Sequence, residues 1–171
     1  MAQILQTRSD CSRCAALCCI AYPADKMPGF SASKEAGEPC PNLDACGLCR
    51  IYERRAEEGF SGCIAFECFG AGQHVVQHLF EGRDWREDPA LLRPMVDTFL
   101  AMRPVSDLLF LVRHAGTLDL TENEAEDVSR IGLELAEIAS SREKLGDAAA
   151  IARLERRLRE VFADVGRRAK T

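Results

Sequence analysis

The residues of this chain whose types and spacing could do chemistry are its nine cysteines, which all precede residue 69 of 171. They stand at Cys11, Cys14, Cys18, Cys19, Cys40, Cys46, Cys49, Cys63 and Cys68. Thiols at this density either pair as disulfides or bind metal. The odd count and the adjacent pair Cys18-Cys19 fit a disulfide framework poorly, so metal binding is the preferred interpretation.

The first four cysteines have a spacing that predicts convergence on metal. Cys11 and Cys14 form a Cys-x2-Cys pair, whose short loop directs both sulfurs toward one ion. Cys14 and Cys18 lie four residues apart and share one face of the helix that we expect over residues 11–20. Cys19 is rotated by about 100° from Cys18 on such a helix and is expected to serve a second centre or other chemistry.

The later cysteines supply further ligands. Cys46 and Cys49 form a second Cys-x2-Cys pair, whereas Cys63 and Cys68 are spaced too widely for such a pair and could bridge a turn. Thiolate is a soft ligand that suits zinc, iron–sulfur clusters and copper(I). A closed zinc site and a [4Fe–4S] cluster each take four thiolates. Nine cysteines could therefore form two centres with one thiol left over, or one centre with several free thiols.

The cysteines and their flanking residues resemble a known family, the YkgJ-type cysteine-cluster family, whose domain is described as zinc- or iron-chelating. The resemblance covers about residues 11–68 and rests on Cys-x2-Cys-x3-Cys-Cys, Pro39-Cys40-Pro41-x-Leu43, Cys49-x-Ile51-Tyr52-Glu53-x-Arg55, Cys63 and Cys68. It implies eight metal ligands: Cys11, Cys14, Cys18, Cys19, Cys40, Cys49, Cys63 and Cys68. It leaves out Cys46, which we expect to be the spare thiol although spacing alone pairs it with Cys49.

A second resemblance extends beyond the cysteines. The N-terminal region of actinobacterial pentapeptide-repeat proteins is similar to the runs Ser61-Gly62-Cys63, Cys68-Phe69-Gly70-Ala71-Gly72-Gln73 and Gly82-Arg83-x-Trp85-Arg86, and to the helix expected around residues 95–111. The pentapeptide repeat itself does not occur in this sequence, so no activity of a repeat solenoid is implied.

Composition divides the chain into two regions that must position the thiols. Residues 1–70 hold the cysteines and most of the prolines, and we expect a loop-rich metal-binding lobe with short helices over residues 11–20 and 49–58. Residues 71–171 are helical in pattern. The sequence therefore predicts a mostly α fold, in which the cysteine lobe (residues 1–70) packs on a bundle of four or five helices.

Helix boundaries in the second region follow from local signals. A helix is expected to begin near Phe69, another at Asp88-Pro89, and a third at Pro104, with Gly116 ending it. Thr121-x2-Glu124 is a capping box that opens the next helix. A turn at residues 144–147 precedes the last one.

The last two helices carry opposite charge. Residues 119–147 hold nine acids and three bases, whereas residues 150–171 hold seven bases and three acids. We expect the two helices to pair as an antiparallel hairpin. The alternative is that their charged faces form a dimerisation surface.

Other candidate residues have simpler interpretations. His74 and His78 lie four apart, as in some metal-binding pairs, but we interpret them as polar residues on an exposed helix face. His114 is expected near a helix C-terminus, where it interacts favourably with the dipole. Tyr52, Phe66 and Trp85 are expected to pack around the metal site, and Gly70 and Gly72 to allow close packing against it.

Charge and patterning limit the function classes. The net charge of −5 and pI of about 5.3 argue against nucleic acid or an anionic membrane as a partner. The first residues lack the apolar run of a signal peptide, and no stretch approaches the roughly 20 apolar residues of a membrane helix, so we expect a cytoplasmic location. No Ser-His-Asp or paired-carboxylate site is evident, and an enzyme is not the favoured class.

The sequence thus predicts a cysteine-ligated protein that binds zinc or iron as a chelating or structural module. The alternative is an iron–sulfur protein, with a [4Fe–4S] cluster, that transfers electrons or senses redox state. The expected partners are the metal ion and either a second protein or a second copy of this chain, bound through the C-terminal helices.

Overall fold

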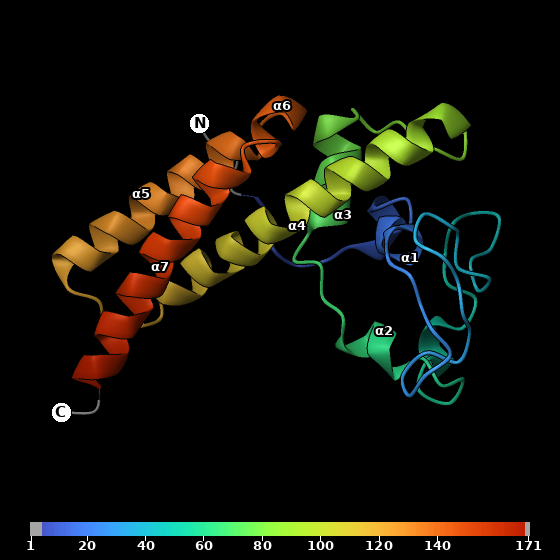
Figure 1. Ribbon diagram of the computed structural model, residues 1–171, viewed down its shortest axis with the longest axis horizontal. Helices are drawn as coiled ribbons and strands as arrows, with labels where there is room; N and C mark the ends of the chain where they lie inside the picture. Colours follow the sequence, from blue (N-terminus) through green and yellow to red (C-terminus); the bar gives the residue numbers. More distant parts are fainter. Residues whose placement is uncertain (1–4, 170–171) are drawn as a thin grey trace.

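A computed structural model describes residues 5–169 and confirms the predicted mostly α fold (Figure 1). Three long helices dominate it: α4 (Leu92–Ala115), α5 (Glu122–Ile138) and α7 (Ala148–Arg168). The described residues contain no β-strand and only isolated bridges, such as that between Ala24 and Lys34. The cysteine lobe therefore depends on turns and short helices for its backbone hydrogen bonds.

Helix α4 passes straight through Pro104, which corrects the prediction that a new helix opens there. Proline within a helix removes one hydrogen bond and costs about 3 kcal/mol. Met102 and Val105 on either side are fully buried in the core, and this burial offsets the cost. Pro94 lies in the first turn of α4, where its missing N–H leaves no partner unsatisfied, and the short 3-10 helix η4 (Pro89–Leu91) precedes it.

Helices α5 and α7 form the antiparallel hairpin that their charges predict, joined by the short helix α6 (Arg142–Leu145) (Figure 1). The capping box at Thr121 is present as predicted, with the Thr121 side chain accepting from the Glu124 backbone. Arg157 of α7 pairs with Glu134 of α5 at 2.8 Å and also with Asp127 at 2.5 Å. The opposite charges of the two helices therefore meet along their shared side.

The helix predicted over residues 11–20 is broken into two pieces. They are the 3-10 helix η1 (Cys11–Arg13) and the α-helix α1 (Leu17–Ala21). Between them Ala15 and Ala16 have φ values of 47° and 56°, a left-handed conformation that alanine adopts at a cost. The indole N–H of Trp85 donates to the Ala15 carbonyl at 2.8 Å and helps to hold this turn.

The other short elements connect the lobe to α4. The predicted helix over residues 49–58 is reduced to the 3-10 helix η2 (Tyr52–Arg54), and α2 (Ser61–Ala65) follows it. The helix expected near Phe69 is α3 (Ala71–His74), which continues as a π-helix, η3 (Val75–Leu79). A π-helix is wider than an α-helix and is often found at functional sites.

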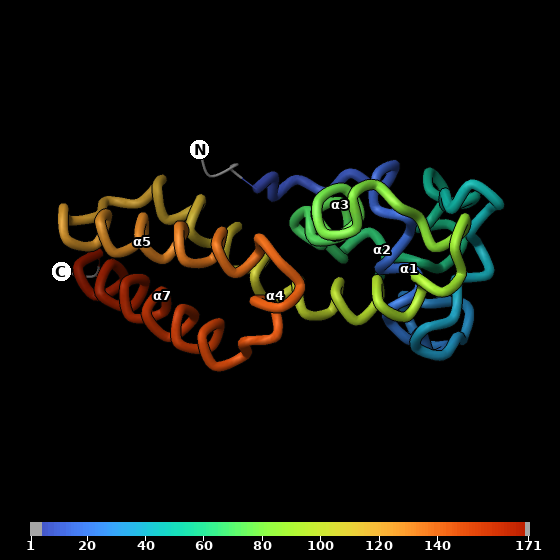
Figure 2. Tube along the Cα trace, turned by 90° about the horizontal axis from the view of Figure 1, so that it is seen from above, coloured from blue at the N-terminus to red at the C-terminus, as the bar shows by residue number. Residues whose placement is uncertain are grey.

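The lobe and the hairpin share one hydrophobic core. Leu17 and Ile20 of α1 belong to the same buried cluster as Leu154 and Leu158 of α7, and α4 connects them through buried residues such as Phe99. Figure 2 shows α4 extending from the hairpin to the cysteine lobe. The thiols are thus positioned by short elements that are anchored on one long helix.

Candidate metal centre

Seven of the nine cysteines line a single cavity of about 240 Å³ in the lobe. These are Cys11, Cys14, Cys18, Cys19, Cys49, Cys63 and Cys68. They come from η1, α1, α2 and the loops between, and Phe99 of α4 reaches the cavity from the core. Segments separated by more than fifty residues in sequence therefore bring their thiols to one place.

Four thiols from the two ends of the lobe form a first group: Cys11, Cys14, Cys18 and Cys68. A hydrogen bond between the first two lowers the pKa of Cys11 to about 6 and raises that of Cys14, and burial and the nearby Cys68 raise the latter further. The pKa of Cys18 is raised by its hydrogen bond with Cys19, by burial, and by Cys14 and Cys68. The pKa values of Cys14 and Cys18 therefore depend on the charge of other thiols in this first thiol group.

The other thiols near the cavity form a second group: Cys19, Cys40, Cys49 and Cys63. Burial raises the pKa of Cys40, and the Cys19 and Cys49 thiols act in the same direction. Burial likewise raises the pKa of Cys63, with Cys19, Cys40 and Cys49 adding to the effect. Cys40 does not line the cavity itself but is held beside it, because its N–H donates to the Cys19 carbonyl at 3.1 Å.

Cys18 and Cys19 join the two thiol groups, with their sulfurs 3.9 Å apart. Two thiolates bound to one zinc ion at about 2.3 Å in a tetrahedral site lie about 3.8 Å apart. Cys18 and Cys19 are therefore close enough to bind the same metal. This differs from the expectation that the rotation of about 100° between them directs Cys19 to a second centre. Their geometry leaves open both one shared centre and two neighbouring ones.

All nine cysteines lie within the described residues, and all nine are free thiols. No group of three or more His, Cys, Asp or Glu side chains in residues 5–169 is already arranged around a common metal position. The donors fit a metal in chemistry and in number, since thiolates are the ligands that zinc and iron–sulfur clusters favour. Binding would require their side chains to close toward one another.

Two cations to which the sequence interpretation assigned no role at the site lie next to the thiols. Hydrogen bonds from Cys14 and Cys18 are the main cause of the lowered pKa values of Cys11 and Cys19, and Arg55, which lines the cavity and stacks over the Tyr52 ring at 3.8 Å, adds to this effect. Lys34 donates to the Ile20 carbonyl at 3.1 Å and also lowers the pKa of Cys19. Positive charge beside a thiol favours the thiolate form, which is the form that binds metal.

Cys46 lies outside the cavity and is exposed. It belongs to a loop organised by Asp44, whose carboxylate accepts hydrogen bonds from the N–H groups of Cys46 and Leu48, each at 2.8 Å. Its partner by spacing, Cys49, does line the cavity. The Cys-x2-Cys spacing of this pair therefore does not place both sulfurs at the same site.

Some of the residues expected to pack around the metal site line its cavity, whereas Trp85 and Gly70 do not. Tyr52 and Phe66 line it, and Gly72 of α3 packs so closely on Cys14 that a Cβ at residue 72 would lie 2.8 Å from the Cys14 Cβ. Ser9 contacts the Cys68 sulfur through its hydroxyl at 2.8 Å. No local signal in the sequence indicated this contact, which spans 59 residues.

Comparison with curated proteins shows a similarity to a longer bacterial protein. The uncharacterized protein YybG of Bacillus subtilis (strain 168) is 40% identical to this chain over 114 residues, which is 67% of this chain and 41% of YybG. The chain thus spans about two fifths of the length of that relative. No family model matches the sequence, and no solved structure matches it. No helix among residues 5–169 is long and apolar enough to cross a membrane.

Proposed function

We propose that this protein binds zinc or iron through cysteine thiolates and acts as a chelating or structural metal module. The observation that supports this most directly is the gathering of seven thiols around one cavity, with Cys40 held beside them. The ligands we propose are the eight of the two thiol groups. Membership of the YkgJ-type family, which the same cysteines suggest, is part of this proposal.

A structural role for the metal follows from how little else holds the lobe together. Residues 23–50 are built from turns and isolated bridges, and two of their large apolar side chains, Met27 and Leu48, are exposed, whereas Leu43 packs against the core. Metal bound by Cys19, Cys40 and Cys49 would cross-link this segment to α1. When a metal site forms only in the folded chain, its binding free energy contributes directly to folding.

A second candidate function is electron transfer or redox sensing by a [4Fe–4S] cluster. The observation that favours it is the presence of two cations, Arg55 and Lys34, beside thiols that are numerous enough to hold a cluster. Arg55 and Lys34 would offset the negative charge of such a cluster, and charge near a cluster tunes its reduction potential.

The proposal also concerns compartment and partners. Nine free thiols are maintained in the reducing cytoplasm, so we propose a cytoplasmic location. The metal ion is the primary partner that we propose, and the C-terminal helices are the candidate surface for a second protein or a second copy of this chain. The acidic balance of the chain disfavours nucleic acid and anionic membranes.

The deciding experiment is a visible absorption spectrum of protein purified without oxygen, combined with analysis of zinc, iron and acid-labile sulfide. A flat spectrum with one or two zinc ions per chain would support the chelating or structural module. A broad band at roughly 400 nm with about four irons and matching sulfide would support the cluster. Protein that contains neither metal, even after anaerobic reconstitution with each, would overturn both functions.

A further inference from the structure

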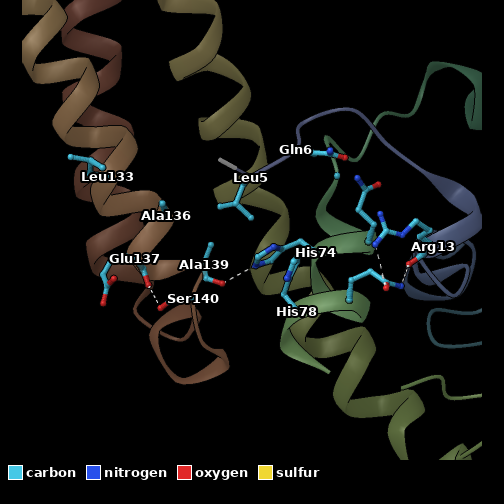
Figure 3. Close-up of a pocket in the computed structure, with 13 residues that line it drawn as sticks. Leu5, Gln6, Arg13, His74, His78, Leu133, Ala136, Glu137, Ala139 and Ser140 are labelled. Carbon is cyan, nitrogen blue, oxygen red and sulfur yellow. Dashed lines mark hydrogen bonds between the residues drawn. The ribbon is translucent and has the colours of Figure 1, made fainter. Parts of the chain in front are cut away.

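A second cavity, of about 720 Å³, lies outside the cysteine lobe's thiol site, between α3 with η3 on one side and the C-terminal end of α5 on the other (Figure 3). His74 and His78 line it together with Ala139 and Glu137 of the α5 end. None of the nine cysteines lines this cavity. Any metal chemistry here would therefore be carried by nitrogen and oxygen donors.

His74 has one ring nitrogen engaged and the other free to accept. Its Nε2 lies 2.8 Å from the Ala139 carbonyl oxygen. Because a carbonyl can only accept, Nε2 must carry the proton and donate, which leaves a lone pair on Nδ1. That Nδ1 is buried and has no hydrogen-bond partner among the described residues. An unsatisfied buried acceptor is costly, so a structure that retains one calls for an explanation.

The environment of His74 also favours the neutral ring. Burial lowers its pKa, the hydrogen bond to the Ala139 carbonyl opposes this, and the nearby His78 lowers it further, so that the net shift is downward. A neutral imidazole with a lone pair on Nδ1 is the form that binds metal. Metal-ligating histidines characteristically donate their other ring N–H to a carbonyl or carboxylate, which is the contact that His74 makes with Ala139.

The ring of His78 is placed to share a ligand with that of His74. The two ring centres are 5.0 Å apart, and the rings are tilted by 36°. Two imidazoles that bind one tetrahedral metal at about 2.0–2.1 Å have ring centres about 5 Å apart. Figure 3 shows the two rings side by side, with Ala139 facing His74. His78 lies in the π-helix η3.

We propose that His74 and His78 form a second metal site, which binds a divalent ion such as Zn²⁺ or Ni²⁺ independently of the cysteines. Imidazole ligands suit these metals. Glu137 lines the same cavity but is paired with Lys144 of α6, so water or an external donor would fill the remaining coordination positions. The site is therefore an open one, of the kind that can bind a further ligand.

The test uses the three imidazoles of the chain, which can be followed individually by NMR in protein that retains its native cysteine-bound metal. On titration with Zn²⁺, the ring resonances of His74 and His78 should shift together and saturate near one equivalent. The ring of His114, which is exposed at the far end of α4, should not respond. The proposal fails if the first two rings do not shift at tenfold excess, or if all three shift alike.

Variants separate this site from the cysteine cavity. His78→Ala, which removes an exposed side chain, should weaken Zn²⁺ binding at least tenfold, whereas His114→Ala should leave it unchanged. Equal affinity in both variants would overturn the proposal. Cys14→Ser should leave the response of the His74 and His78 ring resonances to Zn²⁺ unchanged. Loss of metal binding at the thiols and loss of metal binding at the histidines can therefore be told apart.

Discussion

Gly72 of α3 and Cys14 of the cysteine lobe lie in direct contact, with no space for a side chain between them. A Cβ at residue 72 would also lie 3.7 Å from the Cys14 sulfur. The contact links the helix that begins the second region of the chain to the most buried of the nine thiols. The position of Cys14 in the cavity therefore depends on a residue that carries no chemistry of its own.

Gly72→Ala should destabilise the protein and lower its metal content, because the added methyl group displaces Cys14. Overpacking of this kind costs about 1–3 kcal/mol, and urea unfolding of the loaded protein would measure it. The matched control is Gly166→Ala in α7, where nothing lies within 4 Å of the added Cβ. That change should instead stabilise the helix by about 0.5–1 kcal/mol. Unchanged metal content in Gly72→Ala would contradict the role we assign to the contact.

The thiols should differ sharply in what their loss does to metal content. Cys14→Ser removes a buried thiol of the cavity and should lower bound metal, whereas Cys46→Ser removes an exposed thiol outside it and should not. Elemental analysis of both variants, purified in parallel without oxygen, measures the difference. Equal losses would show that Cys46 is a ligand and that the eight-ligand assignment is wrong.

Removal of the metal should loosen the lobe and leave the hairpin intact. After treatment with a strong chelator, trypsin should cut at Lys26, Lys34 and Arg50 at least ten times faster, since the surrounding turns have little else to hold them. Arg153 and Arg157 lie within α7, whose apolar face is packed in the core, and should stay protected. Mass spectrometry of the fragments identifies the sites, and restored metal should reverse the change. A lobe that resists trypsin equally well without metal would rule out a structural role.

The cap of α5 should contribute a pH-dependent part of the stability. Hydrogen bonding to Arg168 and Thr121 lowers the pKa of Glu124 from 4.5 to about 2. A carboxylate with a depressed pKa in the folded state stabilises it fully above the unfolded value of about 4.5 and loses that contribution as the pH falls toward 2. Relative to Glu124→Gln, which keeps a capping side chain, the native protein should therefore lose thermal stability over this interval.

Circular dichroism melting curves of the two proteins, taken between pH 2 and 6, measure this difference directly. The comparison removes any shared effect of acid on the metal site. Glu126→Gln is the control, because Glu126 is an exposed residue of the same helix that makes no ion pair with the described residues. A difference that is flat across the interval would disprove the assigned coupling between Glu124 and Arg168.

Local signals predicted the helical half of the fold well. The capping box at Thr121 could be recognised in the sequence because it involves only four consecutive residues. The pairing of the last two helices could be recognised because it depends on their opposite charges, which are visible in their composition. The continuity of α4 through Pro104 could not be recognised in the sequence, because it depends on the burial of Met102 and Val105 against other elements. Tertiary packing there overrides the preference of proline for a helix start.

At the candidate site, too, some features could be predicted from the sequence and others depend on tertiary packing. The cysteines that gather at the cavity were identifiable from their types and spacing, but the break at Ala15 and Ala16 was not, because alanine strongly favours an unbroken helix. Trp85, seventy residues away, contributes to that turn. His74 was interpreted as an exposed residue, and the structure corrects this, because Ala139 of the α5 end covers it.

The unbroken course of α4 has a consequence for how this protein can be dissected. Phe99 both reaches the thiol cavity and belongs to the core that continues into the hairpin. A shortened polypeptide ending near residue 70 would therefore lose one wall of its cavity and leave Leu17 and Ile20 without the helix that covers them. The cysteine lobe is therefore not expected to fold as an independent unit. The smallest fragment expected to fold around metal must include α4.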